Sequence, residues 1–233
     1  SDFQSLWWNA DGRSFYVVER TRIVEVSILD GTTRNVVMAP PAEAIITLVG
    51  DQRHGTARQT DGGDLLVMFS NDSTKRAGFA LADVRTGRWS TLREEDRFYG
   101  DRRLQSIDVA DEGQVVFLSE NVKEPTEIWA SGSHLNDFRR ITHSAPQVNG
   151  LQYGESRLIE WSTADGKQCQ GALLLPAGYR PGSRYPLVVY PYPNDHRSDK
   201  INRFGLTGTG VENMQLLATR GFAVLAPDVS IDL

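Results

Sequence analysis

A histidine flanked by carboxylates is the first feature of this sequence whose residue types could do chemistry. His196 follows Asp195 and lies three residues before Asp199, and a histidine beside a carboxylate is the usual form of a general base with its orienting group. The three residues lie in a polar stretch without a nearby nucleophile, so we favour a solvated loop histidine over a base. The other histidines have no metal-ligand spacing and are expected in surface or structural roles: His54, His134 and His143.

Two further segments suggest binding chemistry, and each has a simpler explanation. The glycine-rich residues 205–210 lack the lysine of G-x-x-x-x-G-K-[ST], and Asn213 stands where the third glycine of G-x-G-x-x-G would be. We expect a helix-entry loop there, with Thr209 as the N-cap. The acidic run 94–96 (Glu-Glu-Asp) is compatible with binding a substrate amino group, but a solvated acidic face is favoured.

Composition narrows the class of protein. The chain has 233 residues, of which 39% are hydrophobic and 24% charged, as expected of a soluble globular protein. A net charge of −5 without a Lys/Arg cluster argues against a nucleic-acid partner, and no apolar stretch approaches the ~20 residues of a membrane helix. The single cysteine, Cys169, excludes an internal disulfide and a CxxC metal site. It slightly favours a cytoplasmic location, and no cofactor or metal is expected.

The N-terminal part repeats a short pattern in which an Asp/Gly turn precedes an apolar strand. The turn glycines fall at 12, 62 and 113, and the strands that follow cover residues 14–18, 65–69 and 115–118. A spacing of roughly 50 residues is typical of propeller blades built from four short strands. We therefore favour part of a β-propeller, with about three blades in residues 1–152, over another meander or sandwich of hairpins.

The pattern changes after the fourth turn, at Asp165-Gly166. Two nearly all-apolar strands, residues 187–190 and 222–226, flank a predicted helix over 211–220 that ends at Gly221. Strand, helix and buried strand predict a βαβ unit. We assign residues 153–233 to the start of an α/β domain. Because residues 1–4 lack signal-peptide features and the chain stops after a buried strand, both ends resemble cuts through a larger protein.

Residues 155–228 resemble the start of the catalytic domain of prolyl-oligopeptidase-type (S9) serine peptidases, which include acylaminoacyl-peptidases and dipeptidyl-peptidases. The order and spacing of several short segments carry the resemblance: Ile159–Ser162, Gly171–Pro176, Tyr185–Val189 and Leu217–Asp228. The preceding Glu124–Trp129 and Arg140–Thr142 resemble the last propeller blades of the same family. The implied fold is a β-propeller portion followed by the N-terminal part of an α/β-hydrolase domain.

The resemblance implies acyl transfer by a Ser-His-Asp triad whose nucleophile lies in a G-x-S-x-G turn. That pattern is absent, and the nearest cluster, residues 131–133 (Ser-Gly-Ser), lies among the β-repeats. In the family order all three triad residues would follow Leu233. One family residue matches here: Tyr192 falls on the tyrosine whose hydroxyl donates to the oxyanion. The family usually has small residues such as Gly-Gly next, whereas Pro193 and Asn194 follow here, so a loop tyrosine packed against prolines is the alternative.

The expected parent protein is thus a serine peptidase that hydrolyses short peptides or acylated amino acids. The chain would be inactive alone and would need the remainder of the catalytic domain, either as further sequence or on another chain. Two alternatives stay open. One is an esterase-type acyl hydrolase on the same scaffold, and the other is a non-catalytic propeller binding module with a degenerate hydrolase domain.

Overall fold

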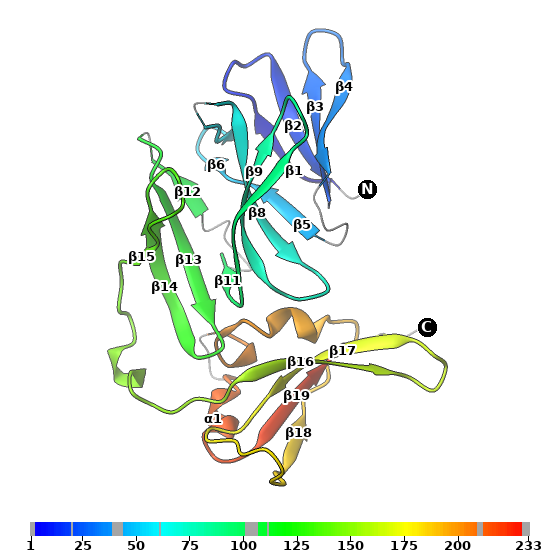
Figure 1. Cartoon of the computed structure of the whole chain (residues 1–233), viewed down its shortest axis with the longest axis vertical. Helices are drawn as coiled ribbons and strands as arrows, with labels where there is room; N and C mark the ends of the chain where they lie inside the picture. Colours follow the sequence, from blue (N-terminus) through cyan, green and yellow to red (C-terminus); the bar gives the residue numbers. More distant parts are fainter. Residues whose placement is uncertain are drawn as a thin grey trace. The chain divides into compact units, whose positions relative to one another are not determined.

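The chain forms two compact units made mostly of β-strands (Figure 1). The computed structural model describes residues 3–19, 21–38, 44–60, 62–100, 107–110, 112–208 and 212–229. Unit 1 comprises residues 1–95, 99–118 and 128–142, and unit 2 comprises residues 96–98, 119–127 and 143–233. Within the described residues, helix is confined to the α-helix α1 (Gln215–Ala218) and three 3₁₀-helices: η1 (Pro146–Val148), η2 (Arg197–Lys200) and η3 (Phe204–Leu206).

Unit 1 is built from successive sheets whose strands are mainly antiparallel. The first sheet contains, in spatial order, β4 (Thr33–Met38), β3 (Arg22–Ser27), β2 (Ser14–Glu19), β1 (Phe3–Trp8), β7 (Thr56–Ala57) and β6 (Gly50–Asp51). The second contains β10 (Trp89–Glu95), β9 (Ala77–Asp83), β8 (Asp64–Asn71) and β5 (Ala44–Leu48). The third places β11 (Phe98–Tyr99) and β12 (Ile107–Val109) on β13 (Val115–Asn121), followed by β14 (Glu124–Ser131) and β15 (Arg139–Arg140). Parts of β11, β13 and β14 in this sheet, namely residue 98 and residues within 119–127, belong to unit 2. The expectation of repeated β-structure in several sheets is confirmed.

One type of turn recurs where the sequence predicts it. Its glycines have φ between +67° and +85°, and each N–H donates at 2.8–3.0 Å to the carbonyl three residues earlier: Gly12, Gly63, Gly113 and Gly166. Glycine favours this left-handed backbone because it has no Cβ. The glycine with positive φ in the second turn is therefore Gly63, whereas the sequence pattern predicted Gly62. The preceding Asp61 and Asp111 lie outside the described residues.

The middle sheet of unit 1 is buried on both faces. Along β8, Leu65, Val67 and Phe69 belong to a core shared with the first sheet, whereas Leu66 belongs to a core shared with the third. On β9, Phe79 joins the second of these cores, where its ring centroid lies 4.9 Å from that of Tyr99. Because side chains alternate between the faces of a strand, one run of apolar residues fills two cores.

Unit 2 contains a mixed four-stranded sheet. Its spatial order is β16 (Ser156–Ser162), β17 (Gln168–Leu174), β19 (Ala223–Pro227) and β18 (Leu187–Val189). The strands β16, β17 and β19 pair antiparallel, whereas β18 and β19 are parallel, with Val188 opposite Val224. A parallel pair needs a crossover connection, and here it contains η2, η3 and α1. The predicted strand–helix–strand order is thus present.

The helix of this crossover is shorter than predicted. The sequence predicts residues 211–220, but α1 covers only Gln215–Ala218. Asn213 limits its start, because the Asn213 side-chain Oδ1 accepts a hydrogen bond from the Gln215 N–H at 2.9 Å. Thr209, the predicted N-cap, lies outside the described residues. The C-cap of α1 is Thr219 and not the predicted Gly221, because the helix ends at Ala218. Gly221 lies two residues further on, where it has φ +87° and its N–H donates to the carbonyl of Ala218.

The strand β18 differs from expectation in its burial. Its apolar run predicts burial on both faces, yet Leu187 and Val189 are 53% and 51% exposed. Val188 packs against the core of unit 2, whereas Val224 of β19 is fully buried in it. The reason is position: β18 is last in the spatial order of the described strands, so it has one neighbour where β19 has two.

A buried glutamine ties α1 to two other segments of unit 2. The Gln215 side-chain amide donates to the carbonyls of Val122 (2.8 Å) and Gly154 (3.0 Å) and accepts from the Gly154 N–H (2.9 Å). Val122 lies at the tip of the β13–β14 hairpin. On the same hairpin Glu120 is fully buried and accepts a hydrogen bond from Arg203. The hairpin tip is therefore part of the unit that carries the mixed sheet.

Replacing Gln215 by leucine should destabilise unit 2. The substitution keeps the apolar bulk but removes both donors and the acceptor, and each buried polar group left without a partner costs about 1–3 kcal/mol. We expect the free energy of unfolding in urea to fall by at least that amount. The matched control is Leu216→Gln on the exposed side of the same helix, which should change stability by less than about 0.5 kcal/mol. Equal stabilities for the two variants would contradict the role of Gln215.

Candidate functional site

Two loops leave the mixed sheet at the same edge, where they form the candidate site. Residues 190–200 follow β18, and residues 228–229 follow β19. Parallel pairing brings the carboxyl ends of both strands together, which is where open α/β sheets bind their ligands. The loops are joined by a backbone hydrogen bond of 2.8 Å from Asn194 N–H to the Val229 carbonyl and by a bridge between Asp195 and Val229.

Asp228 fixes the first loop from the end of β19. One carboxylate oxygen accepts the backbone N–H of Ser198 and the other accepts its hydroxyl, both at 2.7 Å. Ser198 is fully buried. Hydrogen bonds to a carboxylate are stronger than neutral ones, so this double contact holds the start of η2 against the sheet.

Tyr192 lies at the exposed bend of the same loop. Its side chain is 56% exposed, and its hydroxyl makes no hydrogen bond with any residue that the structure describes. The Tyr192 carbonyl accepts the N–H of Asp195 at 3.3 Å, and Asn194 has φ +56° in this bend. Asparagine tolerates the left-handed conformation better than most residues. The Pro-Asn sequence thus makes a turn here without glycine.

A buried arginine lies beside Tyr192. The Arg197 guanidinium carbon is 4.8 Å from the ring centroids of both Tyr190 and Tyr192. The Tyr190 hydroxyl donates to Glu212 at 3.1 Å, and this hydrogen bond, with burial and the Glu212 charge, raises the pKa of the Tyr190 phenol. Sequence reasoning missed Arg197, because no local pattern indicates that its charge would be buried against two tyrosines.

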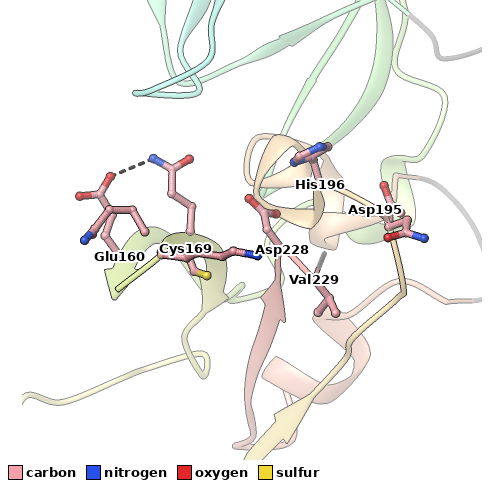
Figure 2. Close-up of a pocket in the computed structure, with 10 residues that line it drawn as sticks. Glu160, Cys169, Asp195, His196, Asp228 and Val229 are labelled. Carbon is pink, nitrogen blue, oxygen red and sulfur yellow. Dashed lines mark hydrogen bonds between the residues drawn. The ribbon is translucent and has the colours of Figure 1, made fainter. Parts of the chain in front are cut away.

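A cavity of about 530 Å³ borders the loops (Figure 2). Figure 2 shows Glu160 and Cys169 on one side, Asp195 and His196 on the other, and Asp228 between them. Lys167, Gln168, Gln170, Asn194 and Val229 complete the lining. The lining therefore combines apolar surface with charged side chains of both signs.

The structure does not pair His196 and Asp195 as a base with its orienting group. His196 is exposed, while the Asp195 carboxylate accepts a hydrogen bond from Lys200 at 2.6 Å and lies 3.0 Å from Arg197 Nε. This arrangement supports the interpretation of His196 as a solvated loop residue. Within the described ranges, no group of three His, Cys, Asp or Glu side chains is arranged to hold a metal ion.

The other residues singled out in the sequence belong to local structure. In unit 1, Ser131 Oγ and Gly132 N–H both donate to Asp137, at 2.8 and 2.7 Å, so the Ser-Gly-Ser cluster forms a turn. Glu95 of the acidic run accepts from Arg93 at 2.7 Å. In unit 2, Gly205 lies inside η3, and Gly210 lies outside the described residues. Of the helices that the structure describes, none has the length and hydrophobicity to cross a bilayer.

Solved structures provide the comparison with known proteins. The chain is similar to AtxE2 isopeptidase with astexin3-dC4 bound (18% identity, TM-score 0.66, 94% of this chain and 32% of that one). It is also similar to puromycin hydrolase complexed with PGG (14%, 0.67, 97% and 33%) and to Porphyromonas gingivalis dipeptidyl peptidase 4 (15%, 0.63, 97% and 30%). At these identities the likeness is one of fold, and the chain spans about a third of each matched structure. No protein-family model and no curated protein matches the sequence.

Removing the Asp228 carboxylate should loosen the loop that carries Tyr192. In Asp228→Ala both Ser198 donors lose their acceptor, and a charged hydrogen bond contributes about 1.5–3 kcal/mol. We expect faster amide hydrogen exchange at Ser198 and its neighbours in η2. Ser198→Ala is the matched control, because it removes only the hydroxyl and should give a smaller change. Unaltered exchange in Asp228→Ala would show that the carboxylate does not hold the loop.

Proposed function

We propose that this chain is part of a serine peptidase of the prolyl oligopeptidase type that acts on short peptides or acylated amino acids. The observation that carries the proposal is the extent of the fold likeness. Single matches to an isopeptidase, a puromycin hydrolase and a dipeptidyl peptidase each cover 94–97% of the chain. Each match therefore includes both the antiparallel meanders and the mixed sheet, a combination that an unrelated β-protein would not share.

In this proposal the two kinds of sheet belong to two different domains. Residues 1–152 are part of a β-propeller, and residues 153–233 begin an α/β-hydrolase domain. The recurring glycine turns, about 50 residues apart, support the first assignment. The parallel pair β18–β19 with its helical crossover supports the second.

Tyr192 is proposed to stabilise the oxyanion of the tetrahedral intermediate. When a nucleophile attacks a carbonyl, negative charge develops on its oxygen, and a fixed O–H donor stabilises that charge. Tyr192 has the required features: it lies at the carboxyl edge of the parallel strands, its side chain is half exposed, and its hydroxyl has no hydrogen-bond partner among the described residues.

The nucleophile and its base are proposed to lie in a longer protein. The 233-residue sequence contains no G-x-S-x-G turn, and the chain spans only about a third of the structures it matches. The proposed partners are a peptide or acyl substrate and the remainder of the catalytic domain. The single cysteine, Cys169, supports a reducing, cytoplasmic setting.

The isolated 233-residue chain should therefore show no serine-hydrolase activity. A fluorophosphonate probe reacts with an activated serine, and none of the serines in this chain lies in a nucleophile turn. We expect no labelling after incubation with the probe, while the longer protein is labelled under the same conditions. Labelling of the isolated chain would contradict the assignment of the nucleophile to another part of the protein.

In the longer protein, Tyr192→Phe should lower kcat for amide hydrolysis by about 10²–10³, the effect of losing one oxyanion donor. KM should change much less, because the phenylalanine ring still fills the same space and only the transition state uses the hydroxyl. A panel of aminoacyl and dipeptidyl p-nitroanilides, with the matching esters, measures both constants. The matched control is Tyr179→Phe, which removes a hydroxyl away from the site.

Other outcomes separate the alternatives. Hydrolysis of the esters without the anilides would favour an esterase. Absence of both hydrolysis and probe labelling in the longer protein would favour a binding module with a degenerate hydrolase domain. Full activity in Tyr192→Phe would refute the oxyanion role while leaving a hydrolase in place.

A further inference from the structure

Arg197 is a charged side chain in a buried position. The residue is 8% exposed although it lies in the loop next to the half-exposed Tyr192. Arginine is seldom buried without compensating partners, because removing its charge from water is costly. The position of Arg197 therefore needs an explanation in terms of what its guanidinium contacts.

The contacts of the guanidinium are aromatic and ionic. Its carbon lies 4.8 Å from the ring centroids of both Tyr190 and Tyr192. Its Nε is 3.0 Å from a carboxylate oxygen of Asp195, yet this nitrogen has no aligned hydrogen bond. The distance marks an ion pair, but the N–H does not point along it. The planar group thus contacts both tyrosine rings and also pairs with the carboxylate.

Tyr192 in turn depends on Arg197. The residue is 56% exposed and, among the described residues, its ring makes no other cation–π or aromatic contact. An exposed tyrosine without such a contact would sample several rotamers, and its hydroxyl would occupy no single position. A donor has to be held in place before charge develops if it is to stabilise a transition state.

Arg197 itself is held firmly. It is the first residue of η2, and the next residue, Ser198, is fixed by Asp228 through two 2.7 Å hydrogen bonds. Lys200 donates to the same Asp195 carboxylate at 2.6 Å, so this anion pairs with a second cation besides Arg197. A chain of contacts thus leads from the end of β19 through η2 to the guanidinium.

We infer that Arg197 is a positioning residue that stacks on Tyr192 and fixes its hydroxyl for the oxyanion role; the catalytic part of this inference rests on the proposed function. A planar guanidinium suits this task, since it stacks on an aromatic face as well as carrying charge. An ammonium group carries the charge but is compact and strongly hydrated. A lysine at position 197 should therefore keep the positive charge but fail to hold the Tyr192 ring in place.

The first test measures the contact in the chain itself. With 3-fluorotyrosine incorporated, the ¹⁹F signal of Tyr192 is assigned by its disappearance in Tyr192→Phe. In Arg197→Lys and Arg197→Met this signal should move towards the position of free fluorotyrosine and narrow, while signals other than those of Tyr190 and Tyr192 stay in place. An unchanged Tyr192 signal in folded Arg197→Lys overturns the inference. Lys200→Met is the control, because it removes the other cation beside Asp195 and should leave the Tyr192 signal unchanged.

The second test measures the consequence in the longer protein. Arg197→Lys should lower kcat about tenfold with little change in KM, the size expected for a desolvated cation–π contact. In a Tyr192→Phe background the same substitution should lower kcat less than twofold, because the hydroxyl it positions is already gone. Equal losses in both backgrounds would show that Arg197 does not act through Tyr192. A protein in which Tyr192→Phe has no effect refutes the proposed oxyanion role of Tyr192, and the ¹⁹F measurement still decides whether Arg197 fixes the ring.

Discussion

The carboxylate of Asp228 is the interaction on which the candidate site depends. It accepts two hydrogen bonds from Ser198 and so joins the end of β19 to the loop that follows β18, thirty positions earlier. That contact requires both strands to end at the same edge of the sheet, which parallel pairing ensures. The position of η2, the burial of Arg197 and the exposure of Tyr192 all follow from where this loop is held.

Unit 2, which carries the candidate site, is organised around the same mixed sheet. The core beneath it contains Leu174 of β17, Val224 of β19 and Met214 next to α1. The tip of the β13–β14 hairpin also belongs to this unit. The Val122 carbonyl accepts a hydrogen bond from the Gln215 side chain, and Glu120 accepts one from Arg203. The site-bearing unit is therefore not a continuous stretch of sequence, because residues 96–98 and 119–127 belong to it as well.

Local patterns predicted much of this architecture. The glycine turns, the apolar run of β8 and the strand–helix–strand order are local features, so they are visible in sequence. The burial of β18 was predicted incorrectly, because an apolar run does not tell whether a strand has one neighbour or two. The length of α1 was overestimated, because a side chain, that of Asn213, limits its start.

The contacts that define the site were beyond sequence reasoning. Asp228 and Ser198 are thirty residues apart, and Gln215 and Val122 are ninety-three apart, so only the folded chain brings them together. Arg197 is two residues from a charged partner and five from Tyr192, yet its spacing resembles that of any solvated loop arginine. Tyr192 was singled out through a family resemblance, and its place at the carboxyl edge of parallel strands now gives it a physical setting.

The central claim is that the Tyr192 hydroxyl stabilises an oxyanion. A crystal structure of the longer protein with a fluorophosphonate adduct on its nucleophilic serine tests it most directly, because a phosphonyl oxygen then mimics the oxyanion. The account predicts that the Tyr192 hydroxyl lies about 2.7–3.1 Å from that oxygen, with the ring still stacked on Arg197. A Tyr192 hydroxyl that points away from the adduct, with other donors around the phosphonyl oxygen, would contradict it.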